Sequence, residues 1–233
     1  MLHLRSMPDI EYQYFYRRNL PHYQPLGGTF FITTCLTGSI PRSTIDWYLK
    51  EKHRFEQQAD NLPTSERAKR EREIRRRWFS RIESALHKST SGPIWLKDER
   101  VAKIVMDALH FFDGKRYRID AFTVMPNHLH LVIAPLQMIA TDNNALTRTE
   151  ILRNQERYYS LPHIMHSIKS FTSLEGNKLL DRSGEFWQSE SYDHAIRNQQ
   201  EWERVIAYVI NNPVKAGLVR HWQEWPYTYV RTM

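Results

Sequence analysis

The sequence contains one cysteine in 233 residues and no long hydrophobic segment. The single thiol, Cys35, excludes a disulfide framework and any zinc cluster built from several thiolates within one chain. The longest apolar runs, such as Leu129 to Pro135, are far shorter than the ~20 residues of a membrane-spanning helix. Residues 1–10 mix charges with a proline and lack the apolar core of a signal peptide. We therefore expect a soluble protein of a reducing compartment, with no membrane partner.

Basic residues are concentrated in one part of the chain. The formal net charge is +7, and residues 64–88 carry +5 of it, with nine basic and four acidic side chains. Such clustering is typical of a surface that contacts nucleic acid. The alternative is a solvated helix whose charges pair along its own face, as Glu71 and Arg75 would. The candidate DNA-binding residues in this run are Arg70, Arg75, Arg76 and Arg77.

Hydrophobic periodicity predicts an α+β domain. Strands are expected at 29–36, 117–124, 128–134 and 186–192, and helices after Asp98, within 161–180 (apolar side Ile164, Ile168 and Phe171) and after Asn198. An inserted helical pair is expected at about 43–93. Without it, the element order is that of a ferredoxin-like βαββαβ antiparallel sheet with an extra C-terminal helix. The whole chain, 1–233, is thus predicted to be a single domain with an N-terminal arm, 1–28, and a polar loop at 138–157.

Two histidines lie two residues apart on one predicted strand. Because alternate strand residues point to the same face, His128 and His130 should project together while Leu129 faces the core. Two parallel imidazoles on a rigid strand make a good half-site for a divalent ion. A pair of exposed histidines on a hairpin is the simpler interpretation of the motif taken alone.

A polar line follows the last predicted helix beside its apolar stripe. Arg204, Tyr208 and Asn212 are spaced at i, i+4 and i+8, which places the Tyr208 hydroxyl beside the Asn212 amide. Taken singly, Tyr208 would be an amphipathic packing residue. Asn212, just before Pro213, would be an amide that ends the helix.

Four segments together resemble the REP-associated tyrosine transposases of the single-tyrosine HUH endonuclease superfamily, which are related to the transposases of the smallest insertion sequences. They are GGTFFITTCL (27–36), VMPNHLHLVI (124–133), FWQSESYDHAIRN (186–198) and YVINNPVKAGLV (208–219). The resemblance covers about 16–37 and 94–230, and leaves the insertion without a transferred role. It implies the ferredoxin-like fold and a bacterial, cytoplasmic, nucleoid-associated protein.

The resemblance implies a role for each motif residue. His128 and His130 match the metal-binding histidines, Tyr208 matches the nucleophile, and Asn212 stands where relatives carry the third metal ligand, an asparagine or glutamine. Mg²⁺ or Mn²⁺ is the expected cofactor. The implied reaction cuts single-stranded DNA at palindromic hairpins through a 5′-phosphotyrosine bond. Arg17 and Arg18 resemble the arm that helps recognise a tetranucleotide beside the palindrome.

Other residues keep two interpretations each. Lys169 and Arg197 are candidate phosphate contacts or solvated cations. Tyr192 is a second phenol whose strand setting favours packing, and His194 either supports the site or caps a helix. The competing functions are a domesticated protein that binds palindromic DNA without cutting it, and a metal enzyme of unrelated chemistry. Monomer and homodimer both remain compatible with the sequence.

Overall fold

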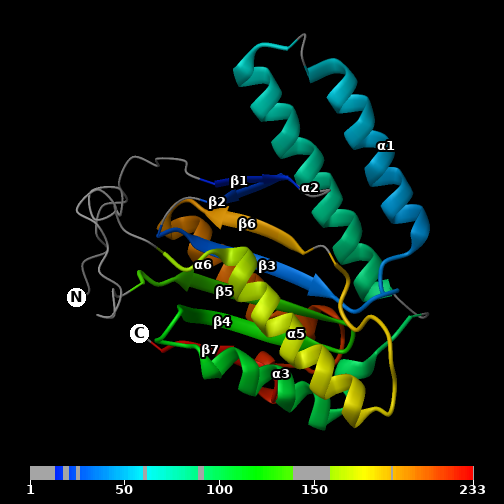
Figure 1. Ribbon diagram of the computed structural model, residues 1–233, viewed down its shortest axis with the longest axis vertical. Coiled ribbons are helices and arrows are strands. Elements are labelled where there is room, and N and C mark those ends of the chain that lie inside the picture. The colour runs from blue at the N-terminus through cyan, green and yellow to red at the C-terminus, as the bar shows by residue number, and fades with distance from the viewer. Residues whose placement is uncertain are drawn as a thin grey trace, which may run out of the picture.

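A computed structural model describes residues 14–17, 21–24, 27–59, 62–88, 92–138, 158–189 and 191–232. Its centre is a five-stranded antiparallel sheet of order β6-β3-β5-β4-β7 (Figure 1). The strands are β3 (Thr29–Cys35), β4 (Tyr117–Met125), β5 (His128–Pro135), β6 (Tyr192–Ile196) and β7 (Thr228–Val230). Strands β3, β4, β5 and β6, numbered one to four along the chain, lie side by side in the order four, one, three, two, which is the ferredoxin-like arrangement. The predicted fold class is therefore confirmed.

Both ends of the sheet differ in detail from the prediction. The three-residue strand β7, which was not expected, extends the sheet along β4. The prediction of a continuous strand at 186–192 is only partly borne out: Trp187 forms a single antiparallel bridge with Leu36, and β6 begins at Tyr192. Phe186 and Trp187 are both buried in the same cluster, whereas successive residues of a strand would point to opposite faces. These aromatic residues form a loop that packs inward.

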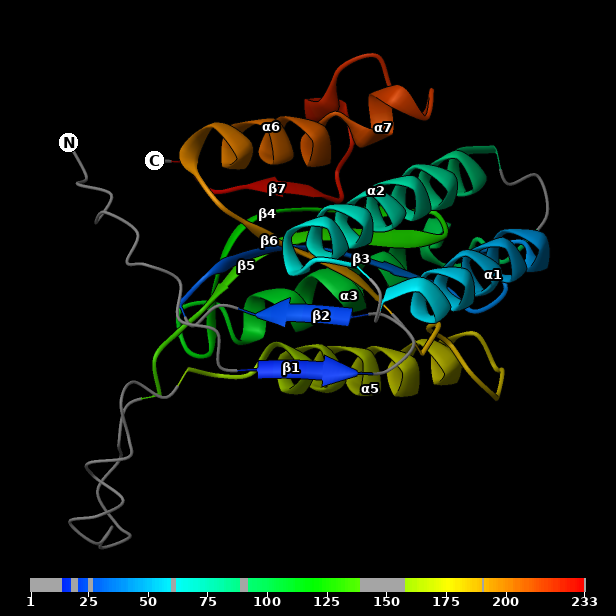
Figure 2. The same cartoon turned by 90° about the horizontal axis from the view of Figure 1, so that it is seen from above.

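Helices cover the two faces of the sheet unequally. Helices α3 (Glu99–Phe111) and α5 (Leu161–Leu179) lie on one face, and α6 (Gln199–Ile210) with the short α7 (Asn212–Lys215) lies on the other (Figure 2). The predicted N-caps Asp98 and Asn198 each accept a hydrogen bond from a main-chain N–H in the first turn. On α5 the apolar side was partly mispredicted: Phe171 is 52% exposed, and Thr172 turns inward to hydrogen-bond Trp187.

The main core lies on the α3 and α5 side of the sheet. Leu129, Leu131 and Ile133 of β5 point into it, as predicted from their alternation with the histidines. The opposite side of β5 carries His128 and His130, which are therefore held on a strand whose other face is fully packed. This packing fixes the direction of both imidazoles.

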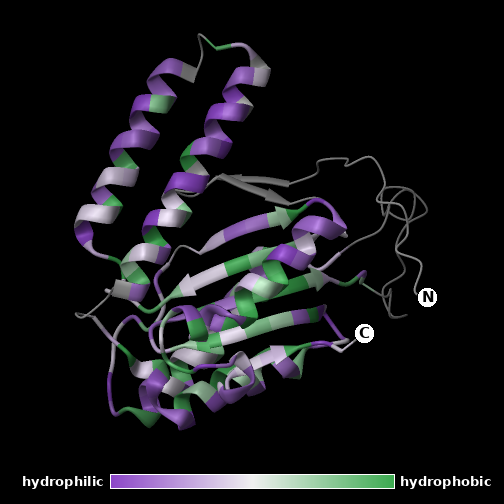
Figure 3. Cartoon of the chain, turned by 180° about the vertical axis from the view of Figure 1, so that it is seen from behind, coloured by the Kyte–Doolittle hydropathy of each residue, from purple (hydrophilic) through white to green (hydrophobic). Residues whose placement is uncertain are grey.

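The inserted helical pair is confirmed. Helix α1 (Arg42–Ala59) and helix α2 (Thr64–Lys88) run antiparallel and project from the sheet (Figures 1 and 2). Both are hydrophilic over most of their length (Figure 3). A second cluster anchors their base: Cys35, Ile40, Tyr48, Trp78, Ile82 and Leu86. This contact places α2 on the same face of the sheet as α6.

The N-terminal arm contains a hairpin that periodicity did not predict. Strand β1 (Tyr14–Arg17) pairs antiparallel with β2 (Pro21–Gln24). The expected loop at 138–157 lies outside the described residues except for Met138. Short 3₁₀ turns, η1 (Trp95–Lys97) and η2 (Trp222–Glu224), complete the described elements. In the described part of the chain, every helix is too short or too polar to cross a membrane.

Candidate active site

The two histidines of β5 face each other in a buried position. The exposed fraction is 1% for His128 and 0% for His130, and their Nε2 atoms are 3.1 Å apart. This separation is close to the ~3.0 Å between adjacent ligands that each lie about 2.1 Å from a six-coordinate ion. The interpretation as an exposed surface pair is wrong, because the insertion and α6 cover them.

The outer nitrogen of each imidazole is held by a neighbouring side chain. The Nδ1 atom of His128 is 2.6 Å from the amide oxygen of Asn127, and that of His130 is 2.8 Å from the hydroxyl of Thr33. Since an amide oxygen only accepts, His128 donates from Nδ1 and keeps an unprotonated Nε2. Partners of this kind fix the tautomer of metal-binding histidines.

Burial favours the neutral form of both imidazoles. Burial, aided by the nearby His87, lowers the pKa of His128 to about 3. Burial and the proximity of His128 also hold the pKa of His130 well below its usual value. Neutral imidazole is the form that binds a cation, so the electrostatics favour the binding-competent form of both side chains.

A carboxylate from the insertion completes this group. Glu83 on α2 is 9% exposed, and its Oε1 lies 3.6 Å from the Nε2 atom of His130. One ligand atom from each of Glu83, His128 and His130 lies within 4.8 Å of the others. Burial raises the pKa of Glu83 to about 7, opposed by the charge of Lys215 and by the Asn212 amide.

Tyr208 lies next to this cluster, on α6. Its hydroxyl donates a hydrogen bond to Oε2 of Glu83. Its ring lies edge-on to His130, with centroids 5.4 Å apart, and against Phe31 at 5.8 Å. The Lys215 ammonium is 5.1 Å from the ring centroid. The predicted nucleophile and the two predicted metal ligands thus lie together, as the family resemblance implied.

Asn212 also lies in this site, but it belongs to α7 and not to the helix that carries Tyr208. It does not continue the polar line of the helix, because α6 ends at Ile210 and Asn212 begins α7, where Pro213 fits the first turn. The side chain is fully buried, and its Oδ1 is 3.2 Å from Nε2 of His87. Arg204, the third member of the predicted line, is exposed.

The donor set fits a divalent cation. Oε1 of Glu83 is buried and has no hydrogen-bond partner among the described residues, although it is the atom that faces His130. Two imidazole nitrogens can bind a divalent transition-metal ion, and the carboxylate oxygen is the kind of ligand that Mg²⁺ and Mn²⁺ prefer. A cation at this position would satisfy the unpaired carboxylate oxygen.

Sequence reasoning missed Glu83 and His87. Both lie in the insertion, to which no role was assigned, and both sit one residue after an apolar residue of its stripe, Ile82 and Leu86. A carboxylate and an imidazole spaced at i, i+4 beside a buried stripe were the available signal. Without the fold, nothing indicated that this stripe would pack beside the histidines.

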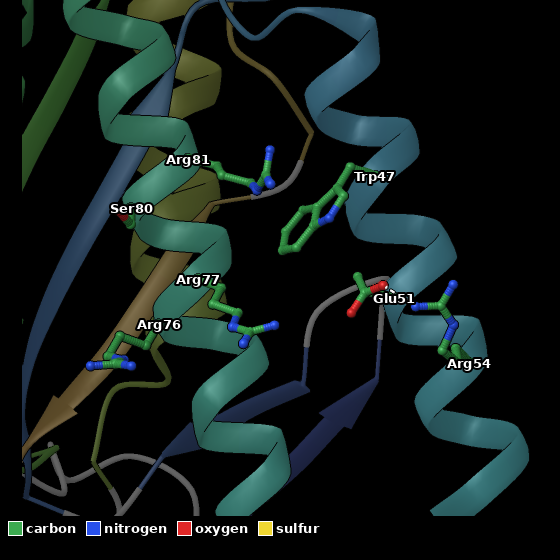
Figure 4. A pocket seen from close by; sticks show the side chains of 7 residues that line it. All are labelled: Trp47, Glu51, Arg54, Arg76, Arg77, Ser80 and Arg81. Atoms are coloured by element: carbon green, nitrogen blue, oxygen red, sulfur yellow. Dashed lines mark hydrogen bonds and ion pairs between the residues drawn. The ribbon is translucent and has the colours of Figure 1, made fainter.

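Of the predicted DNA-binding arginines of the insertion, Arg76 and Arg77 line a cleft and Arg70 does not. An open cleft of about 730 Å³ between α1 and α2 is lined by Trp47, Glu51, Arg54, Arg76, Arg77, Ser80 and Arg81 (Figure 4). The Arg81 guanidinium is 4.2 Å from the centroid of the Trp47 ring. Arg70 is exposed nearer the tip of α2, and the side chain of Arg75 lies outside the described residues.

The remaining candidate cations lie elsewhere. Arg17 ends strand β1, and Arg18 is not among the described residues. Lys169 on α5 donates hydrogen bonds to the main-chain oxygens of Gln188 and Ser189. Arg197 is exposed between β6 and α6.

The alternative candidates are held by packing or by other partners. Tyr192 stacks on Phe79 of α2 with centroids 4.6 Å apart, in agreement with the expected packing role. His194 is 2.9 Å from a carboxylate oxygen of Glu201 in the first turn of α6, and so supports the start of that helix.

Comparison with known proteins gives relatives over part of the chain. An Escherichia coli REP-associated tyrosine transposase is 26% identical over 112 residues, 48% of this chain and 53% of the relative. A Haemophilus influenzae protein, provisionally given the same name, is 29% identical over 108 residues, 46% of this chain and 56% of the relative. The matched region thus spans little more than half the length of either relative. No family model matches the sequence.

Among solved structures, a REP-associated tyrosine transposase bound to a REP hairpin is 16% identical, with a TM-score of 0.46 over 93% of this chain and 82% of that one. The sequence relatives carry the name of the family that the four motifs resemble. The resemblance to REP-associated tyrosine transposases is therefore confirmed.

Proposed function

We propose that this protein is a metal-dependent enzyme that cuts and rejoins single-stranded DNA at hairpin-forming palindromes, through a covalent bond to Tyr208. The observation that carries the proposal is the juxtaposition of a tyrosine hydroxyl, a carboxylate and two neutral, buried histidines. The Tyr208 hydroxyl donates a hydrogen bond to one oxygen of Glu83, and the other oxygen of Glu83 faces His130. The Nε2 atoms of His130 and His128 are 3.1 Å apart. The names of the sequence relatives support a transposase.

The residues present match the demands of this chemistry. A phenol with a pKa near 10 is a weak nucleophile at neutral pH and needs a group that orients it and takes its proton. Tyr208 Oη would bond to phosphorus as the bond from phosphorus to the 3′ oxygen breaks. The phenolic proton passes along the hydrogen bond to Glu83, and the 3′ oxygen takes a proton from solvent. A divalent ion bound to His128 and His130 would offset the charge that develops on the phosphate.

The product of cutting also suits rejoining. The 5′-phosphotyrosine bond conserves the energy of the broken phosphodiester, so the 3′-hydroxyl of the same or another strand can attack it. In that step the new bond from oxygen to phosphorus forms as Tyr208 leaves and recovers its proton. No nucleotide cofactor is needed.

The insertion supplies a surface for the DNA. Its arginines offer phosphate contacts, and the Trp47 ring beside Arg81 offers a face on which an unpaired base can stack. Arg17 and Arg18 of the arm, Arg70 and Arg75 of α2, Lys169 and Arg197 are proposed as further phosphate contacts. Binding through such contacts should weaken steeply as salt is raised.

The decisive experiment is an adduct assay. The purified protein is incubated with a labelled hairpin oligonucleotide and Mn²⁺, and a covalent complex is detected on a denaturing gel. Tyr208→Phe should lose the adduct completely and keep its affinity for the DNA, because only one hydroxyl is removed. Tyr192→Phe is the matched control and should keep the adduct.

Each component of the proposal has its own contrary result. An adduct with Tyr208→Phe would show that another residue is the nucleophile. Adduct formation that is unchanged in EDTA, or in the His128→Ala variant, would remove the role of the metal. Tight binding of the hairpin by the wild-type protein with no adduct would favour the domesticated binding protein.

A further inference from the structure

We propose that Glu83, supplied by the inserted helix α2, is the third protein ligand of the metal ion, in the role that the family resemblance implied for Asn212. This inference rests on the proposed metal-dependent function. It gives the insertion a part in the chemistry, in addition to DNA contact.

The position of Glu83 carries the inference. The ligand atoms of Glu83, His128 and His130 lie within 4.8 Å of one another, and the Oε1 atom nearest His130 has no hydrogen-bond partner in the described part of the chain. A buried carboxylate oxygen without a partner is unfavourable unless a cation meets it. A histidine binds a metal ion as a neutral imidazole, so Glu83 is the one residue of these three that can bring negative charge to the ion.

Asn212 lies beside Glu83 and His128, and its amide oxygen also has a partner outside the proposed ligand group. Its only oxygen, Oδ1, lies 3.2 Å from Nε2 of His87, one turn beyond Glu83 on the same helix. A hydrogen bond from His87 occupies one of the two lone pairs of this oxygen and holds the amide toward α2. We therefore assign Asn212 as a positioning residue, which with His87 fixes α7 against α2.

The second oxygen of Glu83 joins the ion to the nucleophile. Oε2 accepts the hydrogen bond from Tyr208 while Oε1 faces the histidines. One carboxylate therefore orients the phenol and holds the cation. Ligation by Asn212 alone would leave the tyrosine without this link.

Metal affinity measured without DNA tests the assignment. Free Mn²⁺ gives a sharp electron paramagnetic resonance signal that falls when the ion binds, so a titration yields the dissociation constant of each variant. Glu83→Gln keeps the shape of the side chain and removes its charge. It should weaken Mn²⁺ binding by about tenfold or more, because even residues that only support ligands change affinity by about 10- to 100-fold.

Two further variants make the test specific. Glu66→Gln removes the same charge from an exposed position in the first turn of α2 and should leave the dissociation constant unchanged. Asn212→Ala should weaken binding less than Glu83→Gln does. Thermal unfolding without metal checks that each variant is folded.

The outcomes separate this inference from the function on which it rests. If Glu83→Gln binds Mn²⁺ like the wild type while His128→Ala does not, the metal site stands and the assignment of Glu83 is overturned. A larger loss for Asn212→Ala than for Glu83→Gln overturns it in favour of Asn212. If the wild-type protein binds no Mn²⁺, the metal step of the proposed function fails as well.

Discussion

Asn127 connects the inserted helix to the histidine pair, and its removal should weaken metal binding from outside the metal site. Its Nδ2 donates to the main-chain oxygen of Leu86 on α2 at 3.2 Å, and its Oδ1 lies 2.6 Å from Nδ1 of His128. The side chain is buried, so water cannot replace these partners easily. Asn127→Ala should therefore act on both the position of α2 and the orientation of His128.

The size of the effect follows from these two bonds. At about 0.5–1.5 kcal/mol each, their loss should lower the free energy of unfolding by about 1–3 kcal/mol. For a chain of this length each kcal/mol lowers the melting temperature by roughly 2–4 °C. Because Asn127 orients a proposed metal ligand, Mn²⁺ affinity should also fall by about 10- to 100-fold.

Asn127→Asp divides the two roles. It keeps an oxygen for His128 and loses the donor to Leu86, so it should cost stability and reduce Mn²⁺ affinity less than Asn127→Ala does. Asn177→Ala is the matched control on the opposite face of the sheet, where the amide bridges Gly184 and Arg182. It should cost stability alone. Wild-type Mn²⁺ affinity in Asn127→Ala would refute the reasoning.

Two further predictions concern the core and the proposed DNA-binding surface. Gly176→Ala would place a methyl group 2.7 Å from the buried Phe186 ring. The resulting overpacking, about 1–3 kcal/mol, should outweigh the gain of about 1 kcal/mol in helix propensity and lower the melting temperature. A higher melting temperature would show that the Phe186 ring moves to make room. Replacing Arg76 and Arg77 by Gln should reduce the slope of log affinity for single-stranded DNA against log salt by about 1.4, or about 0.7 for each phosphate that is no longer neutralised. Lys103→Gln, which removes an exposed charge from α3, should leave that slope unchanged, and equal slopes in all three proteins would contradict the assignment of the cleft.

Local patterns were sufficient to predict most of the helices, the three central strands and the histidine pair. The alternation of strand residues alone requires His128 and His130 to share a face, and side-chain chemistry alone makes Asp98 and Asn198 helix caps. The order of these elements then leaves few topologies, of which the ferredoxin-like sheet is one. The resemblance added the pairing of Tyr208 with the histidines, which lies beyond local pattern.

The parts that the sequence did not reveal depend on tertiary contact. Glu83 joins the site because Ile82 and Leu86 pack beside Cys35, a contact between segments that are about 50 residues apart in the chain. The pairing of Asn212 with His87 follows from the same docking. Strand β7 has only three residues and takes its conformation from β4. Periodicity within a window cannot report any of these.

The insertion carries the proposed DNA contacts and the proposed metal ligand Glu83 on one helix, α2. Arg76 and Glu83 are seven residues apart on α2, so they lie on the same side of the helix, about 10 Å apart along its axis. Arg77 and Arg81 point instead toward α1 and Trp47 (Figure 4). A DNA strand with one phosphate at Arg76 could therefore run along the face of α2 that leads to Glu83 and Tyr208. The orientation of α2 would then affect both DNA binding and the reaction.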